Sequence, residues 1–287
     1  MRARIKVFKR PMRFWRPGTS IIELVISRYK DLIREGDMLV FSEKALSVAE
    51  GLVYDEELVK PDRLSRLAAD LVCKKLWPRL LRRLLKDPLS LRVLIETPLE
   101  DLARHKKIVL RICGPLYALK PFSECGIDAT NLPYKYVSLP LRRADEKARW
   151  LRREFERELG FPVSVLISDS DGCFKPRGVK GIALASRPSS VSGIVNLGSI
   201  AYVIGKALKK YFLEYPTPVA YDGSWIGLEG LLKISRIVEK ARGSGLGIDV
   251  VEMVRRLGAD SYRDVRWRDL ERIPHFPVIL VRLIPEA

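Results

Sequence analysis

The sequence predicts an α+β fold, and three of its segments indicate this class. The run Val163–Ile167 is short and largely apolar, which is typical of a buried β-strand. Residues Arg4–Lys9 alternate between polar and apolar side chains, as a half-buried strand does. Residues Ala144–Leu159 carry dense charges of both signs, which indicates a solvated helix with paired side chains. With 287 residues and 47% hydrophobic side chains, the chain can bury a substantial core.

The first half of the chain alternates between helix and strand signals. An amphipathic helix is predicted from Ile21 to about Arg34, with Thr19 or Ser20 as its cap. The apolar run Met38–Phe41 predicts a short buried strand. The further elements predicted here are helices over 62–77, interrupted by Pro78, over 79–86 and over 88–96, and a strand over 108–112.

The second half adds strands and helices beyond the first buried run. The predicted elements are, in order, a strand over 181–185, a helix over 193–212, a strand-like turn over 216–223, a helix over 228–241, polar helical structure over 248–272 and a closing strand over 277–282. No internal repeat or low-complexity tract interrupts this series.

The composition indicates an anionic partner. Lysine and arginine number 52 against 35 aspartates and glutamates, which gives a net charge of +17 and a pI near 9.8. Such an excess favours binding of a nucleotide, a polyphosphate, an acidic cofactor or nucleic acid. The dense charge of both signs also fits a thermophile surface with networks of ion pairs.

Cysteine and histidine usage makes several kinds of site unexpected. The four cysteines lie far apart without a Cys-x-x-Cys pair, so neither a zinc site nor a disulfide framework is expected, and free thiols suit a reducing cytoplasm. Only His105 and His275 are present, so chemistry built on a histidine base is not expected. No apolar run approaches the ~20 residues of a membrane span, and the basic N-terminus lacks the apolar core of a secretory signal.

Two acidic motifs are the strongest indication of a functional site. The first is Gly126–Asn131, which contains Asp128, and the second is Ser168–Gly172, which contains Asp169. Asp169 is expected where the strand over 163–167 ends and a loop begins, which is where open α/β sheets bind ligands. Because Mg²⁺ prefers one or two carboxylates together with phosphate oxygens and water, this pair predicts a divalent cation on nucleotide phosphates.

Several segments together resemble the gamma-glutamyl ligase family of the deazaflavin coenzyme F420. They occur in the family's order and cover roughly residues 1–186. The similar segments are Gly36–Lys44, Ser47 with Ala49–Gly51, Asp87–Pro88 with Val93–Glu96, Gly126–Asn131, and Ile167–Ser170 with Gly172 and Gly178.

This resemblance implies a two-lobed fold with mixed sheets, an intertwined homodimer and a GTP-dependent amide ligase. GTP would phosphorylate a carboxylate of an anionic deazaflavin precursor, and the amine of L-glutamate would attack the acyl phosphate. Asp128 and Asp169 would hold Mg²⁺ or Mn²⁺. No catalytic residue is assigned. The side chains that the resemblance places against the nucleotide are Ser42, Glu43, Lys44, Asn131 and Ser170.

The chain also departs from the family pattern. Val48 stands where the family has a lysine, and Cys173 stands where it has an arginine, for which Lys175 or Arg177 could substitute. The resemblance therefore divides the chain into a ligase-like core over 1–186 and a divergent part over 187–287. This second part would hold an insertion over 243–273 and the closing strand over 277–282. A homologue with another substrate, or without ligase activity, is one alternative.

Two other classes of function are open at this stage. The motif Asp169–Gly172 after an apolar strand is similar to the nucleophile motif of haloacid-dehalogenase-type phosphatases, in which Asp169 would be the nucleophile and Asp171 the acid and base. The net charge also admits a basic nucleic-acid-binding protein, although no known nucleic-acid-binding motif is present. The gamma-glutamyl ligase interpretation is preferred because it alone accounts for both acidic motifs.

Overall fold

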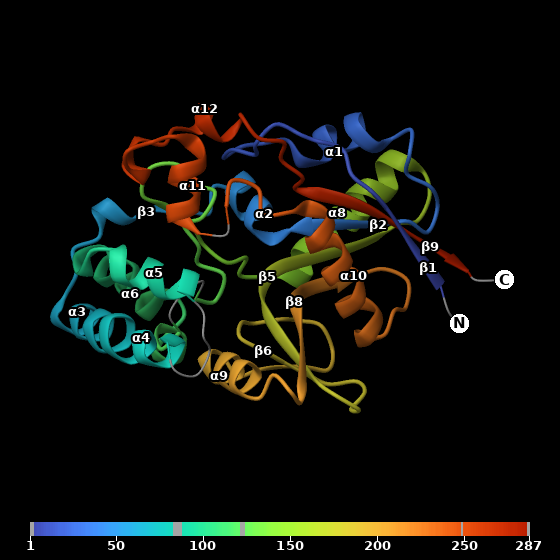
Figure 1. The fold of residues 1–287 in the computed structure, drawn as a ribbon. Coiled ribbons are helices and arrows are strands. Elements are labelled where there is room, and N and C mark those ends of the chain that lie inside the picture. Colours follow the sequence, from blue (N-terminus) through green and yellow to red (C-terminus); the bar gives the residue numbers. More distant parts are fainter. Residues whose placement is uncertain (1–2, 83–87, 121–123, 248, 286–287) are drawn as a thin grey trace.

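A computed structural model describes residues 3–82, 88–120, 124–247 and 249–285, and its centre is a mixed seven-stranded sheet (Figure 1). The strands follow the order β1-β9-β2-β5-β6-β7, and β8 pairs with β5. β2 and β5 are parallel, as are β6 and β7, and the other pairs are antiparallel. The predicted α+β class with mixed sheets is therefore confirmed. The strands are β1 (Ala3–Phe8), β2 (Met38–Ser42), β5 (Ser164–Pro176), β6 (Ala183–Ala185), β7 (Ile194–Asn196), β8 (Phe212–Asp222) and β9 (Val278–Pro285).

Both faces of the central strands are buried, because alternate side chains enter two different cores. In β2, Leu39 and Phe41 pack toward helices α1 (Ile21–Tyr29) and α8 (Ala144–Leu159). Met38 and Val40 point the other way and join the core beneath α10 (Leu228–Arg242). This burial on both sides explains why the strands are apolar runs rather than alternating sequences.

A group of helices lies to one side of the sheet, in blue-green to green in Figure 1. It contains α3 (Arg63–Ala68), the π-helix η2 (Ala69–Leu76), α4 (Trp77–Leu80), α5 (Pro88–Glu96), α6 (Leu99–Ile112) and α7 (Pro115–Ala118). A short helical turn, η1 (Glu56–Leu58), leads into it, and a two-stranded sheet of β3 (Val53–Asp55) and β4 (Tyr136–Ser138) lies nearby.

Several predicted elements in this region are wrong or shifted. Residues 108–112 form the end of α6 and not a strand, because the preceding residues continue the same helical pattern. Pro78 does not end the helical run, because it lies where the π-helix η2 passes directly into α4. The helix predicted from Ile21 ends at Tyr29. Part of the helix predicted over 79–86 falls outside the described residues.

The C-terminal third contributes strands to the same sheet. β8 and β9 pair with β5, β2 and β1, so residues beyond 186 complete the core. The helix predicted over 193–212 is shorter, as α9 (Ser199–Ala207), and lies between β7 and β8. Between α10 and β9 a small unit has its own core of Leu246, Met253, Val265 and Leu270. Its helices are α11 (Val250–Leu257), η4 (Tyr262–Asp264) and α12 (Trp267–Leu270).

Within the described ranges, no helix is long and apolar enough to cross a membrane.

Candidate functional site

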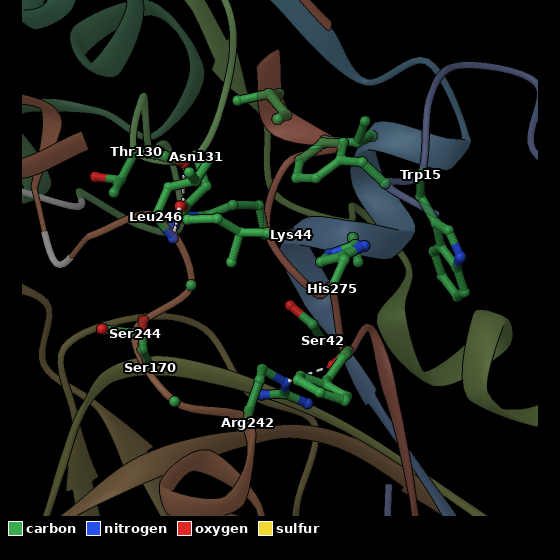
Figure 2. Close-up of a pocket in the computed structure, with 18 of the residues that line it drawn as sticks. Trp15, Ser42, Lys44, Thr130, Asn131, Ser170, Arg242, Ser244, Leu246 and His275 are labelled. Carbon is green, nitrogen blue, oxygen red and sulfur yellow. Dashed lines mark hydrogen bonds between the residues drawn. The ribbon is translucent and has the colours of Figure 1, made fainter. Parts of the chain in front are cut away.

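The acidic motifs meet at a cavity of about 320 Å³ between the ends of β2 and α10 and the bulged part of β5. All the residues predicted for the site except Glu43 border this cavity. They are Ser42, Lys44, Asp128, Asn131, Asp169 and Ser170, several of which are labelled in Figure 2. The structure thus brings together residues that lie up to 128 positions apart in the chain, which is the distance from Ser42 to Ser170.

The parallel pairing of β2 and β5 explains this convergence. Ser42 pairs with Ser168, so the carboxyl end of β2 lies beside the second acidic motif. The first turn of α2 (Glu43–Ala49) then carries Lys44 into the cavity. Asp169 was expected at the end of its strand, but this is wrong, because β5 continues to Pro176. The site instead forms at an irregularity where β5 shifts register against β8 between Asp169 and Gly172.

Lys44 and Asp128 form one ion pair in the cavity wall. The ammonium Nζ contacts Asp128 Oδ2 and donates to the carbonyl oxygen of Thr130 at 3.2 Å. Asp128 Oδ1 accepts from the backbone N–H of Thr130 at 2.7 Å, which fixes the carboxylate in its turn. Burial alone would lower the pKa of Lys44, but the adjacent Asp128 carboxylate outweighs burial and raises it. Lys44 is therefore a cation at neutral pH.

Arg187 forms the second ion-pair cluster and was not identified from the sequence. Its guanidinium contacts Asp169 Oδ2, and its Nη2 donates to Glu43 Oε1 at 2.6 Å. The Arg187 side chain is only 1% exposed. Burial would raise the pKa of Asp169, but the guanidinium outweighs burial and lowers it. The Asp169 carboxylate, which borders the cavity, is thus kept ionised by a guanidinium that does not border it.

Gly126 of the first motif is explained by the same guanidinium. The residue has a positive φ of +87°, and a Cβ there would lie 2.7 Å from Arg187 Nη1. Only glycine combines this backbone conformation with so close an approach. The Gly-Ile-Asp sequence therefore packs the turn against Arg187 while Asp128 faces the cavity.

Glu43 and Asp171 lie behind the cavity wall. Glu43 is buried and accepts from Arg187 and, at 3.1 Å, from the backbone N–H of Leu141. Asp171 is buried against Lys120, whose Nζ is 3.1 Å from Asp171 Oδ1. Burial, opposed by Lys120, raises the pKa of Asp171 to about 7. Because Asp171 does not border the cavity that Asp169 borders, the pair lacks the shared access that the phosphatase interpretation requires.

The donor set fits a divalent cation only together with an anionic ligand. Among the residues that the structure describes, no group of three or more His, Cys, Asp or Glu side chains could hold a metal ion. Asp128 and Asp169 both border the cavity, and each already has a cationic partner. Mg²⁺ commonly takes one or two carboxylates and completes its shell with phosphate oxygens and water. Two carboxylates on one cavity satisfy that requirement when a phosphate is present.

A glycine-rich loop after α10 forms another wall that the sequence reasoning missed. Residues Gly243–Gly247 all border the cavity, and Gly243 and Gly245 have positive φ values of +75° and +56°. Asn131 Oδ1 accepts from the backbone N–H of Leu246 at 2.9 Å, so this predicted nucleotide contact also fastens the loop. The signal was present as three alternating glycines directly after a predicted helix.

Aromatic side chains line part of the cavity. Phe14 and His275 are stacked with ring centroids 4.5 Å apart, and Trp15 meets His275 edge-on at 6.5 Å. Figure 2 shows His275 and Trp15 on one side of the cavity and Asn131 and Ser244 on the other. Burial lowers the pKa of His275 to about 4, so its imidazole is neutral at pH 7. The cavity thus combines charged side chains with flat aromatic surfaces.

The two departures from the family motifs occupy different places. Val48 borders the cavity, where it presents only an apolar surface. Cys173 is buried in β5, and burial raises the pKa of its thiol to about 12. Lys175 and Arg177, suggested as substitutes, do not border the cavity. Lys175 Nζ contacts the Val179 carbonyl oxygen, and Arg177 is exposed beyond the end of β5.

Comparisons with known proteins identify relatives of this chain. The chain is 29% identical over 289 residues to an uncharacterized protein of Methanocaldococcus jannaschii, covering 96% of this chain and 95% of that protein. It is 27% identical over 195 residues to the coenzyme F420:L-glutamate ligase of the same organism, covering 68% of this chain and 69% of the ligase. The ligase of Methanopyrus kandleri is 26% identical over 177 residues, covering 60% of this chain and 61% of the ligase.

A family model described as F420-0:Gamma-glutamyl ligase matches residues 11–209, which include both acidic motifs and Arg187. The match ends before α10, the glycine-rich loop and the small unit that follows it. The chain belongs to the F420-0:gamma-glutamyl ligase family.

Proposed function

We propose that this protein is a nucleotide- and metal-dependent ligase that joins L-glutamate to a carboxylate of a deazaflavin precursor of the coenzyme F420-0 type. The observation that carries the proposal is the convergence of both family motifs on one cavity. Asp128, Asp169 and Lys44 face that cavity from three separate segments. The relatives named as coenzyme F420:L-glutamate ligases support the same reaction class.

The reaction proposed is the transfer of the γ-phosphoryl group of GTP to the carboxylate, followed by attack of the glutamate amine on the acyl phosphate and release of phosphate. Phosphoryl transfer needs mainly positioning and charge neutralisation. A divalent cation, Mg²⁺ or Mn²⁺, held by Asp128 and Asp169 would neutralise the charge of the phosphates.

The protein's own residues prepare the site for this chemistry. Lys44 remains cationic beside Asp128 and is placed to exchange that carboxylate for a phosphate oxygen when a nucleotide enters. Arg187 keeps Asp169 ionised without itself entering the cavity wall. Ser42 and Ser170 offer hydroxyl groups to the cavity, and the neutral ring of His275 offers it a flat surface.

A close functional variant is the second candidate, in which the same chemistry uses a different carboxylate. The uncharacterized relative matches the chain almost end to end, whereas the ligases match only about two thirds of it. The segments beyond residue 209 build the glycine-rich wall and, through His275 and Phe276, part of the aromatic wall, so they help to set the shape that a substrate must fit. The two-lobed arrangement, the homodimer and the cytoplasmic location stay predictions that follow from the resemblance and the composition.

Thermal unfolding tests the nucleotide and metal assignment. GTP with Mg²⁺ or Mn²⁺ should raise the melting temperature more than the sum of the two ligands alone. At a hundredfold excess over the dissociation constant, ligand linkage contributes roughly 2.7 kcal/mol. Asp169→Asn should remove this synergy. Synergy that survives in Asp169→Asn refutes the metal assignment, and hydrolysis of a chromogenic phosphate ester that is lost in the same variant would favour a phosphatase.

A further inference from the structure

Arg242, the last residue of α10, has a guanidinium that the protein satisfies only in part. Its Nε donates to the carbonyl oxygen of Phe276 at 3.2 Å, and its Nη1 donates to Glu239 Oε2 at 2.7 Å. Its Nη2 is buried and has no hydrogen-bond partner among the described residues. The side chain is 14% exposed, and the residue borders the cavity.

A purely structural role explains two of these three nitrogens. An arginine at the C-terminus of a helix complements the helix dipole, and the bond to Phe276 fastens α10 to the segment that leads into β9. Neither interaction gives the Nη2 protons an acceptor. A buried donor without an acceptor costs free energy, and a turn of the guanidinium toward an oxygen anion in the adjacent cavity would remove that cost.

The surroundings of Arg242 offer several groups that can donate to an anion, beside the Glu239 carboxylate, which borders the same cavity. Figure 2 shows Arg242 in the lower part of the view, where Ser42, Ser170 and Ser244, which also border the cavity, are the nearest labelled side chains. The glycine-rich loop begins at the next residue, so backbone groups can approach a ligand closely there. A guanidinium also matches a phosphate with two parallel N–H groups.

The cavity needs such a cation because position 48 does not supply one. Val48 borders the cavity where the family pattern has lysine, and Lys175 and Arg177 lie elsewhere. Lys44 also borders the cavity, but it shares its charge with Asp128 and is a single cation for several phosphate charges. We propose that Arg242 binds a phosphate group in this cavity and takes over the charge that Val48 cannot provide. The identification of that phosphate as part of GTP rests on the proposed function.

Calorimetry with inorganic tripolyphosphate and with GTP, each with Mg²⁺, tests this assignment. A charge-assisted bond of the usual strength predicts that Arg242→Met weakens both ligands by about 10- to 100-fold. Arg236→Met is the matched control, because Arg236 lies on the same helix, contacts a backbone carbonyl and stacks on Tyr215, yet does not border the cavity. Both affinities should be unchanged in that control.

Two further variants separate binding from folding. Arg242→Lys keeps the charge but loses the planar fork, so its affinity should fall between those of the wild type and Arg242→Met. Adding Val48→Lys to Arg242→Met should restore at least about tenfold of the lost affinity, because a lysine would return a phosphate contact to the cavity. An Arg242→Met protein without cooperative thermal unfolding is replaced in the comparison by Arg242→Lys.

The outcomes distinguish this proposal from the ligase proposal. Loss of tripolyphosphate affinity in Arg242→Met, with Arg236→Met unaffected, supports the assignment even where no ligation is detected. Unchanged tripolyphosphate and GTP affinities in Arg242→Met overturn it, and leave a ligase activity of the wild type intact. Failure of the wild type to bind tripolyphosphate also overturns it, as does the absence of any restoration by Val48→Lys.

Discussion

Arg187 is the side chain that holds Glu43 and Asp169 together next to the cavity. One guanidinium faces Glu43 from α2 and Asp169 from β5, and it also fills the space that Gly126 leaves open. Removing one partner from a buried ionic cluster leaves an uncompensated buried charge. The free-energy cost of that charge exceeds the net stabilisation that the intact cluster contributes.

Arg187→Met should therefore lower the free energy of unfolding by about 3–5 kcal/mol. Arg10→Met is the control, because Arg10 forms an exposed ion pair with Asp31 and its loss should cost about 0–1 kcal/mol. Denaturant unfolding of both variants measures the difference. Equal and small losses in the two variants would show that Arg187 does not hold the two carboxylates together.

At the residue scale, the sequence indicated the ligand-facing groups better than the groups that support them. Asp128 and Asp169 were predicted because each is an acidic residue in a short motif, and the motif of Asp169 directly follows an apolar run. Arg187 lies in a loop without a motif, and its role depends on long-range contacts with Glu43 and Asp169. Arg242 is one of two basic residues in the last turn of α10, and only the fold shows that it borders the cavity.

At the scale of elements, local patterns identified most strands and helices but not how far they extend. β5 was expected to end before Asp169, yet pairing with β8 carries it to Pro176 through a bulge. Such pairing is tertiary, and no local signal in residues 168–176 reveals it. Residues 108–112 were misassigned because a short apolar run fits a strand and a buried helix equally well.

The small unit of α11, η4 and α12 should be the least stable part of the site. It is held by a separate core around Met253, which is 1% exposed. Met253→Ala should cost about 2–5 kcal/mol locally and open residues 250–270 to limited proteolysis. Met38→Ala, in the central sheet, should instead lower the global melting temperature without new cleavage there. Identical cleavage patterns would show that the unit unfolds only with the whole molecule.

At the scale of the whole molecule, buried ionic contacts make stability depend on pH. His105 contacts Glu56 through Nδ1 at 2.7 Å and Glu124 through Nε2 at 2.9 Å. Burial alone would lower the pKa of His105, but Glu124 and Glu56 raise it to about 10. Because the folded pKa lies above the unfolded value of about 6.5, this stabilisation is complete below pH 6.5. It is lost as pH rises toward 10.

The free energy of unfolding should accordingly fall between pH 6.5 and pH 10. Proton linkage predicts a decrease on the order of a few kcal/mol. Burial also raises the pKa of Asp171 to about 7. The change in stability that its titration causes therefore lies mainly below pH 7. The difference between the wild type and His105→Gln isolates the histidine. A difference that does not change between pH 6.5 and pH 10 would mean that His105 is not held as a cation.

The central claim concerns what the molecule does, and one measurement tests it most directly. The purified protein is incubated with GTP, Mn²⁺, L-glutamate and the F420-0 precursor, and the deazaflavin product is weighed by mass spectrometry. We predict a product heavier by one or more glutamyl residues, formed only with GTP and metal and lost in Asp128→Asn and Asp169→Asn. An unchanged precursor under these conditions, in a wild-type protein that binds GTP and metal, would contradict the assignment of F420-0 as the substrate.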